Sequence, residues 1–434
     1  MQKINPRTLS GFMELLPKDQ LKFNYIYDAI RNTYEQFGFL PLDTPIIEAS
    51  EVLLAKAGGE TEKQVYQIKK GDNELTLRFD LTVPLAKYVA KNYGELSFPF
   101  RRYQIGKVYR GERAQKGRFR EFYQCDIDII GDGELSIVND AEIPNIIYNV
   151  FKNIGLSDFV IKINNRKLLN GFFDYLNLKE KSSDIMRIID KIEKIGTEKV
   201  IEELKEYDVN NENIDKIIEF INIKGLNENI ISDLKKLNID NELFNTGLEE
   251  LEKVLKYAYN FGMNNDVLEI DLRISRGLDY YTGTVYETFL REHKSIGSIC
   301  SGGRYDNLAE FYTDKKLPGV GISIGLTRLF DQLMELNILE DEQIKVSDML
   351  IIPMTDNYDY IISCYNELVK ENKKVQIFYE KRSIKSIINY ANNLNIPYVI
   401  FIGDDEVNTN KVTIKNIKTF EQKTDTLENI LKEQ

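Results

Sequence analysis

The spacing of apolar residues near the start of the chain predicts a helix followed by strands. Apolar side chains recur at helical intervals over Leu21–Phe37, and Gly38 follows as a common stop signal. Pro41 and Pro45 then favour extended backbone over Phe39–Ile47. Strand patterns with hairpin-scale links come next and predict an antiparallel sheet; they cover Leu75–Phe79, Arg101–Arg110 and Phe119–Ile130.

A helical pattern without proline fills the middle of the chain. None of the ten prolines lies between Pro144 and Pro318, and Lys167–Phe261 repeats Lys, Glu, Ile, Leu and Asn at helical spacing. We interpret this stretch as an inserted helical domain, with a separate helix over Asp140–Asn153 before it. A helix is expected to start near Leu326. Strand patterns return at Val267–Ile274, Thr284–Phe289 and Gly319–Ile324.

After Asp341 the pattern changes to alternating strands and helices. Alternation at this spacing predicts a separate α/β domain with a mainly parallel sheet, joined by a short charged linker near Glu340–Lys345. The expected elements are strands at Met349–Pro353, Val375–Tyr379 and Tyr398–Ile402, and helices at Tyr358–Glu371 and Ile384–Leu394.

Composition narrows the chemistry that the chain can perform. Among 434 residues there is one histidine, His293, so a two-histidine zinc site or a facial iron triad cannot be built. A Ser-His-Asp triad would depend on that single residue. Catalysis is therefore expected to use carboxylates, Arg, Lys, Tyr or Cys, or positioning alone.

The cysteines and the apolar stretches indicate where the protein works. Cys125, Cys300 and Cys364 are far apart and form no CxxC pair, which argues against a zinc knuckle or a disulfide framework and suits a reducing cytosol. Met1–Gln20 has no apolar segment of the signal-peptide type, and no uncharged apolar stretch reaches 18 residues. We therefore expect a cytoplasmic protein.

The charge is uneven along the chain. The formal net charge is −12, yet Arg101–Arg120 contains eight basic residues and a single acid, Glu112. A dense basic segment in an acidic protein favours a phosphate site, whereas the simpler alternative is a solvated basic loop.

The strand pattern beside this segment places polar groups on one side. Period-two alternation puts an aromatic, an amide and two carboxylates on one face: Phe122, Gln124, Asp126 and Asp128. Cys125, Ile127 and Ile129 take the other face. This is either the wet face of a half-buried sheet or, beside the basic segment, a site for a ligand with phosphate and amine groups.

Three glycine-bearing segments could also approach a ligand closely. They are Arg276–Gly283, Ser301–Asp306 and Gly319–Arg328, and none has the spacing of a dinucleotide fingerprint or a P-loop. Arg328 is expected in the first turn of a helix, where a cation opposes the macrodipole. It serves either a bound anion or a nearby acid.

Together these segments resemble class II aminoacyl-tRNA synthetases, and specifically the histidyl-tRNA synthetase family. Gly38–Glu48 resembles the first class motif, at a dimer interface, Tyr109–Gln124 the second and Gly319–Leu329 the third. Arg276–Tyr281 and Ser301–Asp306 resemble the two histidine-specific signatures.

The resemblance implies a fold and a function. The fold is an α+β catalytic core with an antiparallel sheet at residues 1–165 and 266–335, a helical insertion at 166–265, and an α/β domain like the anticodon-binding domain at 346–434. The implied function is a histidine–tRNA ligase that forms histidyl-adenylate from ATP and charges tRNA(His), as a homodimer and with Mg²⁺ accompanying ATP. The alternative is the non-catalytic regulatory subunit of ATP phosphoribosyltransferase, which resembles the same core.

The resemblance also implies roles for particular residues. Arg110 and Arg276 match the catalytic arginines, whereas the metal ligands are not assigned. The histidine-binding positions are Asp80, Leu81, Thr82, Arg110, Gln124, Asp128, Arg276, Tyr280 and Tyr281. The ATP-binding positions are Arg110, Glu112, Arg118, Phe122 and Arg328.

Asp128 and Tyr281 are the pair expected to read the imidazole. A neutral imidazole offers one N–H donor and one acceptor nitrogen, which a carboxylate and a phenol can satisfy. His293 lies outside every matched motif and is expected in a loop.

Overall fold

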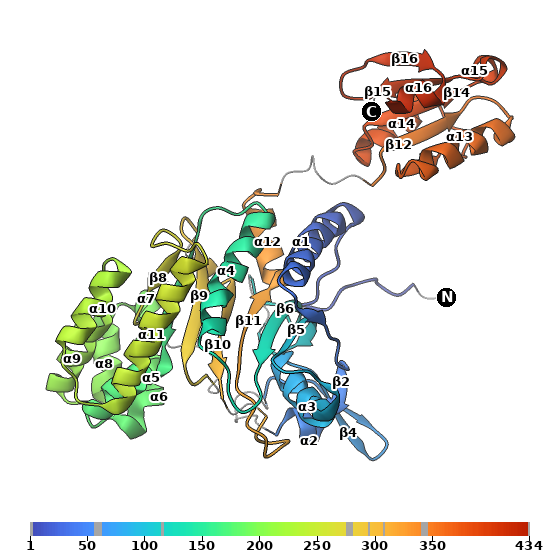
Figure 1. Cartoon of the computed structure of the whole chain (residues 1–434). Helices are drawn as coiled ribbons and strands as arrows, with labels where there is room; N and C mark the ends of the chain where they lie inside the picture. The colour runs from blue at the N-terminus through green and yellow to red at the C-terminus, as the bar shows by residue number, and fades with distance from the viewer. Residues whose placement is uncertain are drawn as a thin grey trace. The chain divides into compact units, whose positions relative to one another are not determined.

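The computed structural model describes residues 3–55, 63–113, 117–274, 281–293, 296–306, 309–339 and 346–432. The chain divides into two compact units, one made of Met1–Glu14 and Ile26–Leu336 and the other of Leu15–Tyr25 and Asn337–Gln434. Figure 1 shows the elements of both units. In the described ranges, no helix has both the length and the apolar character needed to cross a membrane.

Eight strands of the first unit form one sheet in the order β1-β5-β6-β11-β10-β9-β7-β8. The inner pairs are antiparallel, and only the edge pairs, β1 with β5 and β7 with β8, are parallel. The predicted antiparallel core is therefore confirmed. The strands are β1 (Leu40–Pro41), β5 (Phe100–Tyr109), β6 (Glu121–Ile130), β7 (Phe159–Asn165), β8 (Leu268–Ile270), β9 (Thr284–Leu290), β10 (Cys300–Tyr305) and β11 (Gly319–Gly325).

Two details of this sheet differ from the sequence prediction. The strand expected over Val267–Ile274 ends at Ile270, because the Asp271 carboxylate accepts the backbone N–H of Arg273 at 3.0 Å and turns the chain. Strands β7 and β10 were not expected. In β10 the pair Gly302 and Gly303 lowers the strand signal, although both glycines are buried in the sheet.

Three helices pack on one face of the sheet. Tyr34 donates a hydrogen bond to the carbonyl of Cys125 at 3.0 Å, and Tyr286 donates to the carbonyl of Asp140 at 2.7 Å. The buried core therefore lies between this face and the helices, and the opposite face is left for polar side chains. The helices are α1 (Pro17–Gln36), α4 (Val138–Asn153) and α12 (Leu326–Glu335).

A small antiparallel sheet and short helices lie beside the polar face. The sheet has three strands in the order β2-β4-β3. The carboxylate of Asp80 accepts the backbone N–H of Val83 at 3.0 Å and so satisfies one donor at the start of α3. The elements are β2 (Ile47–Ala49), α2 (Ser50–Leu53), β3 (Gln67–Lys70), β4 (Asn73–Leu77), α3 (Thr82–Asn92) and η1 (Tyr93–Glu95).

The middle of the chain is helical, as its spacing predicts. Asn165, Asn210 and Asn241 each accept a backbone N–H with the side chain and so cap the helix that follows. The helices are α5 (Arg166–Tyr175), η2 (Lys179–Lys181), α6 (Ser182–Ile189), α7 (Ile192–Ile195), α8 (Thr197–Glu206), α9 (Asn211–Ile221), α10 (Asn227–Lys236) and α11 (Glu242–Asn260).

The C-terminal part forms a five-stranded sheet in the order β13-β12-β14-β15-β16. Its first three strands are parallel, but β15 and β16 pair antiparallel, so the expectation of a mainly parallel sheet is wrong. The reason is a hairpin turn in which the Asn416 side chain accepts the N–H groups of Lys418 and Thr419. The strands are β12 (Met349–Pro353), β13 (Val375–Ile377), β14 (Tyr398–Ile402), β15 (Val412–Asn416) and β16 (Gln422–Asp425).

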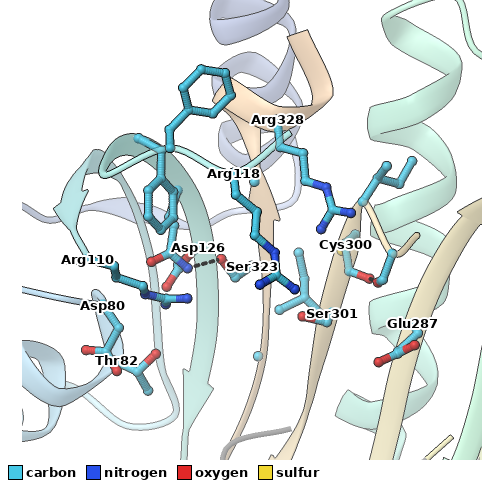
Figure 2. A pocket seen from close by; sticks show the side chains of 18 of the residues that line it. Asp80, Thr82, Arg110, Arg118, Asp126, Glu287, Cys300, Ser301, Ser323 and Arg328 are labelled. Carbon is cyan, nitrogen blue, oxygen red and sulfur yellow. Dashed lines mark hydrogen bonds between the residues drawn. The ribbon is translucent and has the colours of Figure 1, made fainter. Parts of the chain in front are cut away.

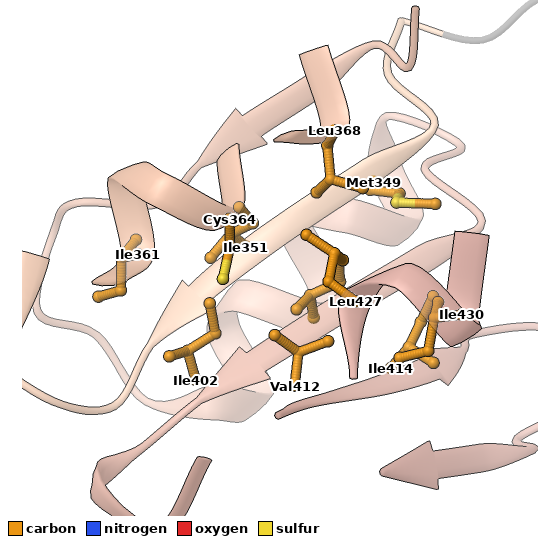
Figure 3. Packing of buried hydrophobic residues seen from close by; sticks show 11 residues of the cluster. Met349, Ile351, Ile361, Cys364, Leu368, Ile402, Val412, Ile414, Leu427 and Ile430 are labelled. Carbon is orange, nitrogen blue, oxygen red and sulfur yellow. The ribbon is translucent and has the colours of Figure 1, made fainter. Parts of the chain in front are cut away.

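Helices cover this second sheet. One core cluster joins Ile351 of β12 to Ile361 and Leu368 of α13 and to Ile430 of α16 (Figure 3). A second cluster packs Leu350 and Ile352 against α14. Successive residues of β12 thus point to opposite cores, which explains why the strand is apolar throughout. The helices are α13 (Tyr358–Lys370), α14 (Ile384–Asn393), α15 (Asp404–Thr409) and α16 (Leu427–Lys432).

Candidate active site

A pocket of about 560 Å³ opens on the polar face of the large sheet. Its walls come from β6, β9, β10 and β11, the segment between β5 and β6, the start of α3, and the first turn of α12. The structure brings together these residues that the sequence predicts: Asp80, Thr82, Arg110, Glu112, Arg118, Phe122, Gln124, Asp128, Tyr281 and Arg328.

Of the predicted residues that the structure describes, Leu81 does not line the pocket. Leu81 is fully buried below it, and its carbonyl faces the guanidinium of Arg102 at 3.5 Å. Arg276 and Tyr280 lie outside the described residues. His293 lies in a turn after β9 and does not line the pocket.

The two faces of β6 are as predicted. Phe122, Gln124, Asp126 and Asp128 all line the pocket. On the other face, Cys125, Ile127 and Ile129 have no exposed surface, and Tyr34 of α1 donates a hydrogen bond to the Cys125 carbonyl there. The alternation of side chains along β6 therefore places an aromatic ring, an amide and two carboxylates on the pocket side of the sheet.

Three guanidinium groups lie around the pocket. Arg110, Arg118 and Arg328 come from different segments and project into the same space (Figure 2). Arg110 lies 5.2 Å over the ring of Phe122 and donates to the carbonyl of Phe79 at 2.9 Å. Three cations around one cavity suit a polyphosphate.

The basic segment as a whole is not a phosphate site, contrary to its interpretation from charge alone. Arg101 pairs with Glu142 on the helix-covered face, and Lys107 pairs with Glu121. Arg102 is buried against Asp128. In the described part of this segment, only Arg110 and Arg118 contribute guanidinium groups to the pocket.

Acceptors without partners mark a second region. The Asp80 carboxylate is buried, and its Oδ2 atom has no hydrogen-bond partner in the described structure. Gln124 donates to Ser323 at 2.7 Å, which leaves its Oε1 atom buried and likewise unpaired. Buried acceptors of this kind fit a ligand that brings N–H donors, such as an ammonium group.

Burial also changes the ionisation of these carboxyl groups. Loss of water raises the pKa of Asp80 to about 6, although the Val83 N–H and the Arg110 guanidinium oppose the rise. Burial raises the pKa of Asp126 to about 7, against the opposing charge of Arg102. A ligand ammonium in the pocket would stabilise the ionised forms.

The third region has a floor made of glycines. Gly321 of β11 lies opposite Asp128 of β6, and Gly303 of β10 lies opposite Gly321. A Cβ atom at Gly321 would lie 2.2 Å from the Asp128 carboxylate, and one at Gly303 would lie 2.9 Å from the ring of Tyr281. Asp128 and Tyr281 therefore occupy space that only glycines leave open.

Comparison with known proteins agrees with this geometry. A sequence profile of histidyl-tRNA synthetase matches residues 11–329, and a profile of the anticodon binding domain matches residues 348–433. The chain belongs to the histidyl-tRNA synthetase family.

Relatives of the synthetase match over its whole length. The histidine–tRNA ligase of Clostridium tetani is 57% identical over 431 residues, which is 99% of this chain and 98% of the relative. That of Clostridium acetobutylicum is 49% identical over 99% of both chains. The crystal structure of histidyl-tRNA synthetase from Nostoc sp. PCC 7120 has a TM-score of 0.91 at 40% identity and covers 100% of both chains.

A more distant structure bears on the alternative function. A Bacillus halodurans chain described as an ATP phosphoribosyltransferase regulatory subunit/histidyl-tRNA synthetase has a TM-score of 0.75 and covers 92% of this chain and 99% of its own. Its identity is 21%, so this likeness shows the fold alone. The identity to full-length ligases supports a ligase and not the regulatory-subunit alternative.

Sequence reasoning missed two side chains that contact Asp128. Arg102 forms an ion pair with Asp128 at 2.5 Å, and Tyr305 donates to the same carboxylate at 2.8 Å. Both belong to segments that the sequence marks, but pairing across strands far apart in the chain decides their contacts. Predicting the pairing register of β5 and β6 would have found Arg102, because it lies directly opposite Asp128.

Proposed function

We propose that this pocket forms histidyl-adenylate from L-histidine and ATP and then passes the histidyl group to the 3′ end of tRNA(His). The chain is an ATP-dependent aminoacyl-tRNA ligase, as its family and its 57% identity to a histidine–tRNA ligase indicate. The observation that carries the residue assignments is the meeting of three guanidinium groups, unpaired acceptors and an aromatic ring in one pocket.

The first step needs alignment and charge neutralisation, and no enzyme nucleophile. A carboxylate oxygen of histidine attacks the α-phosphorus of ATP in line, the bond to the bridging oxygen breaks, and pyrophosphate leaves. We assign Arg110 to the carboxylate and α-phosphate, and Arg118 and Arg328 to the β- and γ-phosphates. Fixed cations stabilise the charge that develops on the phosphoryl oxygens.

We assign the adenine to Phe122 and Glu112. The ring of Phe122 offers a flat apolar face, and the Glu112 carboxylate can accept from the adenine amino group. Both line the pocket beside the guanidinium groups. Arg110 lies over the same ring, so Phe122 contacts both the proposed adenine and the arginine proposed to bind the α-phosphate.

The acceptor groups suit the ammonium of histidine. We assign it to Asp80, Thr82 and Gln124, because two of them carry buried oxygen atoms without a partner in the described structure. Asp128 and Tyr281 are assigned to the imidazole, above the glycine floor. An amino acid without both polar nitrogens would leave these groups unpaired, which rejects it strongly.

Arg276 and Tyr280 keep the roles that the resemblance implies. We propose that Arg276 stabilises the α-phosphate as its charge develops and that Tyr280 and Leu81 contribute to the histidine site. Leu81 would act from beneath the pocket, since it is buried.

In the second step the terminal ribose hydroxyl of the tRNA attacks the histidyl carbonyl, and AMP leaves. We propose a catalytic core at residues 1–165 and 266–335, a helical insertion at 166–265 and a tRNA-binding domain at 346–434. The match of residues 348–433 to the anticodon binding domain supports the last assignment.

Magnesium is proposed only as part of the ATP substrate. Among the described residues, no group of three or more His, Cys, Asp or Glu side chains could hold a metal ion. Phosphate oxygens are the natural ligands of Mg²⁺ in such a complex.

We further infer a homodimer in the cytoplasm. Leu40, Ile46 and Ile47 are exposed within the segment that resembles the first class motif, where an apolar surface suits a partner. All three cysteines are free, which suits a reducing compartment.

Transfer of labelled histidine to tRNA(His) tests the proposal. The chain with ATP and Mg²⁺ should form histidyl-tRNA, and Arg110→Lys should slow this by about 100-fold or more, because lysine lacks the two-pronged donor geometry. Arg101→Lys is the matched control, because Arg101 pairs with Glu142 away from the pocket, and it should keep near wild-type charging. Charging by Arg110→Lys at the wild-type rate would remove Arg110 from its assigned role.

A further inference from the structure

Arg102 is a buried cation beside the imidazole end of the pocket. It lies on β5 directly opposite Asp128 of β6 and has no exposed surface. Its Nη2 atom is 2.5 Å from the Asp128 Oδ2 atom. Its Nε and Nη1 atoms have no hydrogen-bond partner in the described structure, so the ion pair with Asp128 is its main polar contact.

The Asp128 carboxylate is held from three sides. Arg102 takes one oxygen, and the Tyr305 hydroxyl donates to the other at 2.8 Å. Gly321 lies against the carboxylate, where any Cβ atom would collide with it. Each carboxylate oxygen can accept more than one hydrogen bond, so Asp128 keeps the capacity to accept an N–H from the pocket.

The surroundings of this pair are unusually acidic for a protein interior. Asp80 and Asp126 are buried nearby, and Arg102 lies close enough to oppose the effect of burial on both. Burial raises the pKa of Asp128, and the Arg102 guanidinium opposes that rise. The Tyr305 hydroxyl contacts Asp128 from β10, whereas the Tyr34 hydroxyl of α1 donates to the Cys125 carbonyl on the helix-covered side of the sheet. Burial raises the pKa of both tyrosines, so neither carries a charge at neutral pH.

We propose that Arg102 is the positioning residue that orients the Asp128 carboxylate and neutralises its charge, so that the pocket accepts the N–H of a neutral imidazole and disfavours the imidazolium. This inference rests on the proposed assignment of the imidazole to Asp128. The ion pair of Asp128 with Arg102 has no net charge, so it attracts a cation little more than it attracts a neutral ligand. A lone carboxylate in the same place would favour the imidazolium.

Steady-state ATP–pyrophosphate exchange tests this role through the KM for histidine. Arg102→Met should raise that KM by about 10-fold or more at pH 8, while the KM for ATP should stay within about twofold, because the phosphate contacts of the pocket lie elsewhere. Arg102→Lys should recover part of the loss, since it restores the charge. Arg101→Met, which removes the neighbouring arginine on the opposite face, is the matched control.

The pH dependence separates positioning from a merely structural role. The wild-type KM for histidine should rise as pH falls through about 6.5, where free imidazole gains a proton. For Arg102→Met, the ratio of its KM to the wild-type KM should fall between pH 8 and pH 6, because the lone carboxylate binds the imidazolium better. A constant ratio across this range would overturn the proposal.

A double-mutant cycle distinguishes this inference from the assignment beneath it. If Arg102 acts through Asp128, then Arg102→Met should add less than about threefold to the KM in an Asp128→Asn background. Equal losses in both backgrounds would overturn the role of Arg102 and leave the assignment of Asp128 intact. A KM unchanged by Asp128→Asn alone would overturn the assignment itself. Thermal unfolding of each variant shows that the fold is kept.

Discussion

At the scale of single residues, the proposed recognition of the ligand uses acceptors that the protein leaves unpaired. Asp80, Gln124 and Asp126 each have a buried oxygen atom without a hydrogen-bond partner in the described structure. Such atoms lower the stability of the folded chain, since a buried polar group without a partner costs about 1–3 kcal/mol. Binding of histidine is expected to satisfy some of them, which links ligand affinity to stability.

Asp126 should make the stability of the ligand-free chain depend on pH. Its pKa is about 7 in the folded chain, above the value of 3.8 for an ordinary aspartate. Between these values the folded state holds a proton that the unfolded state lacks, so this group's contribution to stability falls as pH rises from about 4 to 7. Asp126→Asn should therefore raise the melting temperature more at pH 8 than at pH 5.

Differential scanning calorimetry at the two pH values checks this expectation. We expect a gain of about 2 °C or more at pH 8 and a smaller one at pH 5. Asp314→Asn, at an exposed position, is the control and should show no such difference. A larger gain at pH 5 than at pH 8 would contradict the assigned shift.

Many of the pocket residues could be predicted at this scale, because the motifs that contain them can be recognised from the sequence alone. Arg110, Gln124 and Asp128 line the pocket as expected. Arg102 was counted with the phosphate-binding cations, because net charge along the chain does not show which face of a strand a side chain takes. Tyr305 lies 177 residues from its partner Asp128, and only the fold brings the two together.

At the scale of elements, local patterns predicted strands and helices where the period was clear. The alternation in β6 gave both faces of the strand correctly. The glycines of β10 concealed its strand pattern in the sequence, so this strand was not predicted. The hairpin of β15 and β16 adds antiparallel strands to the second sheet, which was expected to be mainly parallel. The causes differ: neighbouring strands fix the backbone of β10, whereas a local turn at Asn416 sets the antiparallel pairing of β15 and β16.

The insertion offers a test of packing between elements. Helices α5 and α11 approach so closely that a Cβ atom at Gly247 would lie 2.2 Å from the backbone nitrogen of Leu168. Gly247→Ala should therefore force the helices apart and lower the melting temperature by several degrees, despite the better helix propensity of alanine.

Thermal unfolding compares this variant with Gly94→Ala. A Cβ atom at Gly94 would meet nothing within 4 Å, so this control should be neutral or slightly stabilising. If Gly247→Ala is as stable as the control, the close packing of α5 on α11 is wrong.

At the scale of the whole molecule, the fold class followed from a change of pattern along the chain. Antiparallel strand patterns, a helical middle and a strand–helix alternation are all present in the structure. The arrangement of the eight strands could not be predicted, because β11 and β10 lie between β6 and β9 only after long-range pairing.

The proposed homodimer is testable at this scale. Ile46→Glu places a charge in the exposed apolar segment and should convert the dimer to a monomer, as measured by light scattering after size-exclusion chromatography. Leu226→Glu, at another exposed apolar residue, should leave the dimer intact. A wild-type chain that elutes as a monomer at micromolar concentration would contradict the proposal.

The most direct test of the central claim is ATP–pyrophosphate exchange with each of the twenty amino acids. The pocket is expected to support exchange with histidine and, at comparable concentrations, with no other amino acid, because only histidine satisfies both Asp128 and Tyr281. Binding of ATP and histidine without any histidine-dependent exchange would contradict the claim that this pocket makes histidyl-adenylate.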